Sequence, residues 1–249
     1  MLKLHGIIPP IATPFDHRGD LYKVKVQHNV EKWNRTGLLG YCVCGSTGES
    51  VFLTTEEKIQ MWEWVAQYAD SSKLLIAGTG VESVRETLAL TNKAAEMGYK
   101  AAMVRTPHYY KNLINRTAAQ MLYFRAVADQ SKIPLIIYNW PQTTGVDIAV
   151  EAVVGLSEHP NIIAIKESSG NLEKVMQLIR ERSIPFISTH ADISHAATSI
   201  SHMTVKTEAG DRDKIGVIQK LVQEHVQVDR IVELIQARDA NAAQLHFGM

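Results

Sequence analysis

The stretch of sequence that bears most directly on chemistry is IIAIKESSG, residues 162–170, in which an apolar run leads straight into Lys166. A run of Ile and Ala of this kind is typical of a strand buried on both faces. Burying an ammonium group is costly unless it is paired or loses its proton. Lys166 is therefore predicted to be partly neutral, and a neutral amine can attack a ketone to form a Schiff base. The competing interpretation is that Lys166 extends from a strand end into solvent.

Other side chains suited to this chemistry stand at the ends of other predicted strands. Tyr138 could move the proton that imine chemistry requires. Hydroxyl and backbone N–H groups of a Gly-Ser-Thr-Gly turn could hold a carboxylate without a charged side chain. Each candidate also has a plain interpretation, as a core tyrosine or an ordinary turn residue. The candidates at strand ends are Ser46, Thr47 and Gly48 in GSTGE (45–49), Tyr110 in TPHYY (106–110), Tyr138 in YNWP (138–141), and Ser168.

A repeated strand–turn–helix pattern between residues 6 and 190 positions these candidates. The spacing of the strands matches the length of a βα unit, and Thr54 with Glu57 forms a predicted capping box at one helix start. The predicted strands are GIIPPIATPF (6–15), LGYCVCG (39–45), KLLIAGTG (73–80), AAMVRTP (101–107), PLIIYN (134–139), IIAIKES (162–168) and PFISTH (185–190).

Seven βα units in succession leave two architectures, a doubly wound open sheet and an eight-stranded barrel. The turn after the first strand, ATPFDHRGD (12–20), lacks the glycines of a dinucleotide-binding turn, and Gly78-Thr79-Gly80 is more simply a tight strand exit. The predicted fold class is therefore α/β, a (β/α)8 TIM barrel whose functional residues gather at the carboxyl ends of the strands.

The C-terminal part of this barrel is predicted to be atypical and incomplete. Residues 1–190 supply seven strands with their helices, whereas residues 191–249 match the pattern poorly. SISHMTV (199–205) is the candidate for an eighth strand, and without it two sheet edges would remain unpaired. We therefore expect a compromised barrel wall near the C-terminus.

Composition excludes several classes of partner. Lys plus Arg and Asp plus Glu number 26 each, so no basic field attracts nucleic acid or an anionic membrane. No signal-peptide pattern and no apolar run long enough for a membrane span occur, so a cytoplasmic protein is expected. Cys42 and Cys44 stand two residues apart on one predicted strand, so no disulfide between them is expected. No metal or other cofactor is expected, because His190, Asp192 and His195 are more simply explained as loop residues.

Four ordered motifs together resemble one known family. GSTGE (45–49), TPHYY (106–110), YNWP (138–141) and IAIKESSG (163–170) are similar to motifs of the dihydrodipicolinate synthase/N-acetylneuraminate lyase family of pyruvate-dependent class I aldolases. The resemblance implies a (β/α)8 barrel that assembles as a homo-oligomer, a dimer or a tetramer. It implies the Schiff-base position for Lys166, proton relay for Tyr138, carboxylate-binding and relay hydroxyls for Ser46 and Thr47, and for Tyr110 a place in a neighbouring subunit's site.

One departure from the family concerns the substrate. Dihydrodipicolinate synthases carry an arginine shortly after the Y-N-x-P motif to grip a carboxylate, and Thr143 stands at that position. The predicted function is therefore a Schiff-base aldolase that acts on pyruvate with a small aldehyde, or on 2-oxo acids such as 4-hydroxy-2-oxoglutarate and 2-keto-3-deoxy sugar acids. The alternatives are a dihydrodipicolinate synthase of lysine biosynthesis and a catalytically impaired member that binds a 2-oxo acid.

Overall fold

The centre of the molecule is a parallel six-stranded sheet. The structure is a computed structural model that describes residues 2, 4, 7–181 and 186–188 of the chain. The strands follow one another in chain order, and every neighbouring pair is parallel. The strands are β1 (Gly40–Val43), β2 (Leu74–Gly78), β3 (Ala101–Arg105), β4 (Leu135–Asn139), β5 (Ile162–Glu167) and β6 (Phe186–Ser188).

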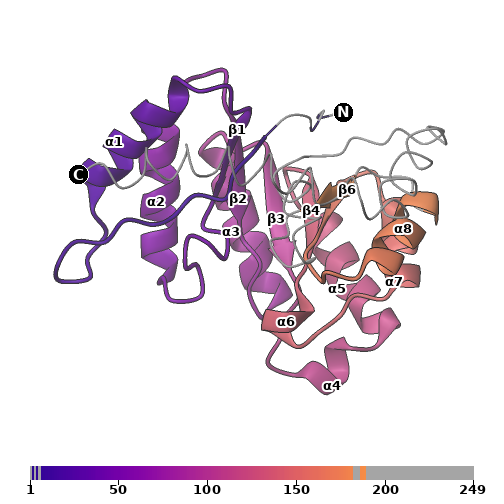
Figure 1. The fold of residues 1–249 in the computed structure, drawn as a ribbon. Helices are drawn as coiled ribbons and strands as arrows, with labels where there is room; N and C mark the ends of the chain where they lie inside the picture. Colours follow the sequence, from indigo (N-terminus) through magenta and orange to yellow (C-terminus); the bar gives the residue numbers. More distant parts are fainter. Residues whose placement is uncertain (1, 3, 5–6, 182–185, 189–249) are drawn as a thin grey trace.

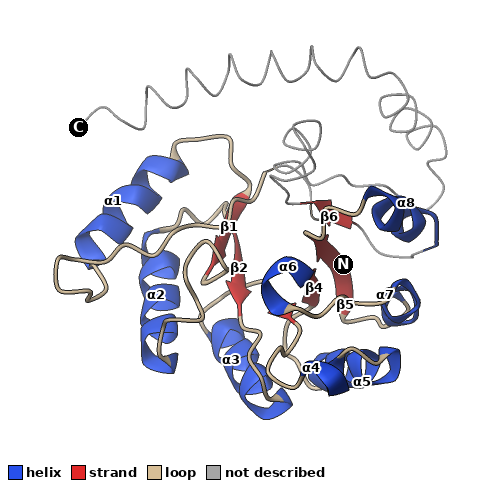
Figure 2. Cartoon of the chain, turned by 60° about the horizontal axis from the view of Figure 1, so that its bottom comes forward, coloured by secondary structure: helices blue, strands red, loops and turns tan. Residues whose placement is uncertain are grey.

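The longer helices lie along the outer side of this curved sheet (Figure 2). A doubly wound sheet reverses its strand order at a switch point, and the described strands contain no such reversal. Sequential parallel strands with helices on the outside are the arrangement of a (β/α)8 barrel, as predicted. The helices are α1 (Lys23–Asn34), α2 (Thr55–Tyr68), α3 (Val84–Glu96), α4 (Lys111–Ile114), α5 (Thr117–Ala128), α6 (Pro141–Thr144), α7 (Val150–Ser157) and α8 (Leu172–Glu181).

The strands are mainly apolar apart from their carboxyl ends, and both of their faces are buried. Val43 and Ile137 face the helices and belong to the larger core, whereas Cys42 and Ile136 belong to a second cluster on the inner face. Successive side chains of a strand point to opposite faces, so one apolar run fills both layers. This accounts for the continuous hydrophobic strands of the sequence.

The first predicted strand, residues 6–15, is only partly formed. Its described residues run beside β1, with a single bridge between Pro10 and Cys42. Backbone hydrogen bonds join Leu39 N to Ile7 O at 2.8 Å and Cys42 N to Pro9 O at 2.9 Å. Two consecutive prolines have no N–H to donate, which weakens the ladder at this place.

Predictions for the C-terminal end of the chain mostly lie outside the described residues. Of the predicted strand 185–190, residues 186–188 form β6. The candidate strand 199–205 and the whole region 191–249 fall beyond the described part of the chain.

Local signals for helix ends and strand exits are confirmed. Thr54 and Glu57 form a complete capping box at the start of α2. Gly78 ends β2, and an added Cβ there would lie 2.1 Å from Cys44 O, so the backbones of β1 and β2 approach too closely for a side chain. The Gly78-Thr79-Gly80 segment is thus a tight strand exit. In Figure 1, α4 and α6 lie together at the carboxyl ends of the strands, where the functional site is expected.

Candidate active site

Lys166 is buried inside the sheet at the carboxyl end of β5. Its side chain does not extend into solvent, since the residue is only 6% exposed. It stands in register with Tyr138 on β4, and Lys166 Nζ lies 3.9 Å from the centroid of the Tyr138 ring. Burial lowers the pKa of Lys166 to about 8, because the interior disfavours its charged form. A substantial fraction of this amine is therefore neutral, and so able to act as a nucleophile, at pH values where most lysines are fully protonated.

Tyr138 links the buried lysine to the turn that follows β1. The residue is 5% exposed, and its hydroxyl lies 3.3 Å from Ser46 Oγ, with either atom able to donate. Burial raises the pKa of Tyr138 to about 12, although hydrogen bonds with Ser46 and Ser168 act in the opposite direction. The phenol is thus protonated and can donate at neutral pH. The 3.3 Å separation is long for two hydroxyls, and such contacts commonly tighten when substrate binds.

The turn at residues 45–50 places two hydroxyl side chains at the surface. Ser46 and Thr47 are both exposed. Cys44, which precedes the turn, and Glu49, which lies within it, have positive φ values of 57° and 54°, a strained conformation for residues with side chains. Such strain is often found at functional sites, and here it bends the chain sharply away from β1.

Gly48 shapes this turn. Its N–H donates to Gly45 O at 3.1 Å, and its carbonyl accepts from the buried Thr13 hydroxyl at 2.7 Å. An added Cβ at Gly48 would lie 2.9 Å from Ile11 O. These contacts hold the turn against the segment that contains Ile11 and Thr13, and they leave the hydroxyls of Ser46 and Thr47 exposed.

The remaining predicted residues differ in their positions. Tyr110 is 71% exposed, and its ring packs edge-on against Tyr109. Thr143 is exposed on α6, directly after Trp140, whose ring stacks on Tyr138 with centroids 6.2 Å apart. Ser168 is buried and its N–H donates to the Asn139 carbonyl at 2.9 Å, which brings its side chain to Tyr138.

A polar network that was not predicted from the sequence lies on the face of β4 and β5 opposite Lys166 and Tyr138. Asn139 and Glu167 each follow a candidate site residue, and both are buried. They contact Asp147 and Lys174. The dipeptides Tyr-Asn and Lys-Glu at the two strand ends could have predicted this network. Side chains alternate along a strand, so the second residue of each dipeptide faces the helices when the first faces the interior.

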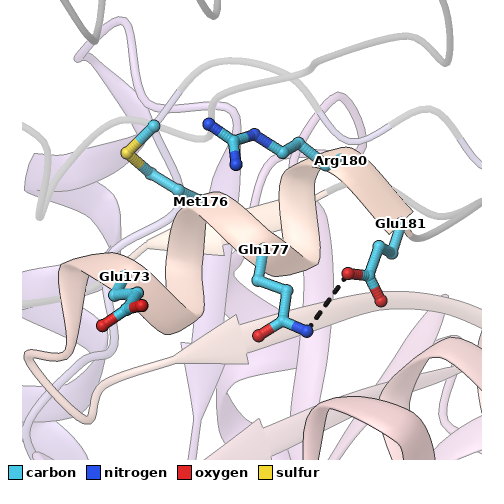
Figure 3. A pocket seen from close by; sticks show the side chains of 5 residues that line it. All are labelled: Glu173, Met176, Gln177, Arg180 and Glu181. Atoms are coloured by element: carbon cyan, nitrogen blue, oxygen red, sulfur yellow. Dashed lines mark hydrogen bonds between the residues drawn. The ribbon is translucent and has the colours of Figure 1, made fainter.

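Two cavities lie away from this chemistry. Among the described residues, the lining of one, of about 500 Å³, consists of five residues of α8 (Figure 3). The other, of about 340 Å³, lies beside the turn and is lined by residues that include Ser50, Lys58, Glu82 and Arg105. Neither lining includes Lys166 or Tyr138.

Within the described residues, no group of three or more His, Cys, Asp or Glu side chains is placed to hold a metal ion. The predicted loop residues His190, Asp192 and His195 fall outside that part of the chain. Among the described helices, none is both long and apolar enough to span a membrane. Both cysteines are buried and free.

Fold and site together define a (β/α)8-barrel protein with a buried lysine of lowered pKa at a strand end. The sequence model of the Dihydrodipicolinate synthetase family matches residues 3–246, a range that extends well past the four motifs. The chain therefore belongs to this family.

Individual relatives agree with the family match. A 4-hydroxy-tetrahydrodipicolinate synthase from Methanothrix thermoacetophila is 41% identical over 176 residues, which cover 70% of this chain and 57% of that relative's length. The structure of a dihydrodipicolinate synthase from Bacillus anthracis superimposes with a TM-score of 0.77 at 28% identity, covering 94% of this chain and 81% of the other. A dihydrodipicolinate synthase from Acinetobacter baumannii complexed with pyruvate gives 0.76 at 26% identity, covering 99% and 84%.

Proposed function

We propose that the protein is a carbon–carbon lyase, a class I aldolase in which Lys166 forms a Schiff base with pyruvate or a pyruvate-derived 2-oxo acid. The observation that carries this proposal is the buried Lys166 amine, 3.9 Å from the Tyr138 ring centroid and with a pKa lowered to about 8. The pyruvate bound to the Acinetobacter baumannii relative supports the choice of 2-oxo acid.

The chemistry follows from the two buried side chains. The neutral Lys166 amine adds to the C2 carbonyl of pyruvate, and water leaves after the carbonyl oxygen gains a proton. The protonated imine withdraws electrons, so a C3 proton is lost and an enamine forms. The enamine attacks an aldehyde carbon, and hydrolysis of the new imine releases product and restores the amine. Tyr138, held by Ser46, relays protons in these steps, while Ser46 and Thr47 hold the carboxylate.

Two candidate reactions remain, which differ in the compound that joins pyruvate or is released from it, and a different observation supports each. The name of the Methanothrix thermoacetophila relative favours condensation with aspartate semialdehyde, the synthase reaction. Thr143 favours cleavage of 4-hydroxy-2-oxoglutarate or of 2-keto-3-deoxy sugar acids, because an exposed threonine cannot hold a carboxylate bidentately as an arginine does.

Covalent trapping tests the Schiff base at Lys166, and a panel of substrates separately tests which reaction the protein catalyses. Borohydride added with pyruvate should leave one covalent adduct, located by peptide mapping on Lys166, and Lys166→Ala should abolish it. An adduct on another lysine would refute the Schiff-base assignment. The panel compares pyruvate release from the hydroxylated 2-oxo acids with condensation of pyruvate and aspartate semialdehyde. Efficient condensation would refute the argument from Thr143 while leaving Lys166 intact, and Thr143→Arg should shift the ratio towards condensation.

We also propose that the enzyme is a homo-oligomer, a dimer or a tetramer. The neighbouring rings of Tyr109 and Tyr110 are 77% and 71% exposed, which is costly for aromatic side chains that remain in water. Sedimentation velocity on the unmodified chain and on Tyr109→Ser and Tyr110→Ser tests this assembly. A monomer at micromolar concentration would contradict it.

A further inference from the structure

Each member of the Lys166–Tyr138 pair is followed on its strand by a buried polar residue. Asn139 follows Tyr138 on β4, Glu167 follows Lys166 on β5, and the two followers stand in register with each other. Because successive side chains alternate, Asn139 and Glu167 face the helices while the pair faces the interior of the sheet. The Glu167 side chain is 0% exposed, so its charge must be balanced within the protein.

The Glu167 carboxylate is fully engaged. Asn139 Nδ2 lies 3.0 Å and 2.8 Å from its two oxygens. The Ser169 N–H donates to Oε1 at 2.7 Å, and Lys174 Nζ on α8 lies 3.6 Å from Oε2. This arrangement joins the carboxyl ends of β4 and β5 on the face opposite the Lys166–Tyr138 pair.

The same contacts extend to the segment after α6. Asn139 Oδ1 accepts from the Ile148 N–H at 3.0 Å, and Asn139 Nδ2 donates to Asp147 Oδ1 at 2.8 Å. Lys174 also pairs with Asp147. The network of Asn139, Asp147, Glu167 and Lys174 therefore fixes both ends of the 140–145 loop, which carries Trp140 and Thr143.

We propose that Asn139 and Glu167 are positioning residues, which hold β4 and β5 in the register that keeps Lys166 Nζ over the Tyr138 ring and which fix the 140–145 loop. This inference rests on the proposed function, because it concerns the same Schiff-base site. A displacement of about 1 Å at reacting groups lowers rates by about 100-fold, so a network of this kind has a measurable effect on chemistry it does not touch.

The test measures the rate of imine formation with pyruvate, followed by a borohydride quench, as a function of pH. In Glu167→Gln one carboxylate oxygen becomes an NH2 group, which cannot accept a hydrogen bond from Asn139 Nδ2 or from the Ser169 N–H, and the negative charge that faces Lys174 is lost. We expect the plateau rate at high pH to fall about tenfold to 100-fold, with the midpoint of the pH profile unchanged. Asp147→Asn is a milder variant, since that side chain is 54% exposed, and it should lower the plateau less.

Asn161→Ala is the matched control. Asn161 precedes β5 and donates to the carbonyls of Ala128 and Ser131 at 2.9 and 3.0 Å, at the opposite end of the strand from Lys166. Loss of these bonds should lower the thermal midpoint and leave the plateau rate unchanged. The comparison separates positioning from a general loss of stability.

Three results would overturn the inference. A lower thermal midpoint with an unchanged plateau in Glu167→Gln and Asp147→Asn would show a purely structural role. A shifted pH midpoint with an unchanged plateau would show that the carboxylate acts through charge instead. Both leave the proposed function standing, because the unmodified protein still traps pyruvate. Absence of trapping in the unmodified protein would overturn the proposed function together with this inference.

Discussion

The pH dependence of imine formation is the most direct consequence of the site. Burial lowers the pKa of Lys166 from an ordinary value of 10.5 to about 8. At pH 7 such an amine is about one-tenth neutral, whereas a lysine titrating near 10.5 is neutral in roughly one molecule in 3,000. The structure thus raises the reactive fraction about 300-fold, which corresponds to about 3 kcal/mol. We therefore expect the rate to rise tenfold per pH unit below pH 8 and to level off above it.

The assay mixes the protein with saturating pyruvate at pH 6 to 10 and quenches samples into borohydride at one fixed pH. Intact mass then gives the fraction with one adduct at each time. Lys93→Ala, which removes an exposed lysine on α3, serves as the control and should reproduce the unmodified profile. A rate that keeps rising until pH 10 would refute the argument that burial prepares Lys166. A flat profile would also refute it.

Three further predictions concern individual side chains. Tyr138→Phe should slow turnover by about 10²–10⁴-fold through loss of a proton-transfer group, with the KM for pyruvate in a steady-state assay nearly unchanged; unimpaired turnover would remove Tyr138 from the relay. Lys166→Met should raise the free energy of unfolding at pH 7 by about 1–3 kcal/mol. The folded-state pKa is depressed, so the cost of burying the charged amine is present in full below pH 8 and fades as the pH approaches 10.5. The difference in free energy of unfolding between the variant and the unmodified protein should therefore shrink over this range, and urea titrations that show a constant difference would contradict the prediction. Thr13→Val should lower the free energy of unfolding by about 1–3 kcal/mol, because the buried Gly48 carbonyl loses its donor. Thr36→Val should change it by less than about 0.5 kcal/mol, because Thr36 is exposed and water can replace the bonds of its hydroxyl to Trp33 O and Leu38 N.

Local sequence patterns were sufficient for the order of elements and for the placement of the candidate residues at strand ends. The apolar runs of the strands and the Thr54 capping box depend on neighbours within a few residues, and both are confirmed. The strand predicted over residues 6–15 forms only in part, because its prolines limit its pairing with β1 to a single bridge. The region after residue 190 remains a prediction from sequence.

The order of the residues indicates a lysine near the end of an apolar strand and a tyrosine near the end of the strand before it. The folded structure shows that Lys166 is buried and that its amine lies over the Tyr138 ring. Desolvation depends on every atom packed around a group, so no local pattern can supply it. The same holds for Asn139 and Glu167. Each is an ordinary polar residue in the sequence, and their contact exists because parallel register brings residues 28 positions apart to the same level of the sheet.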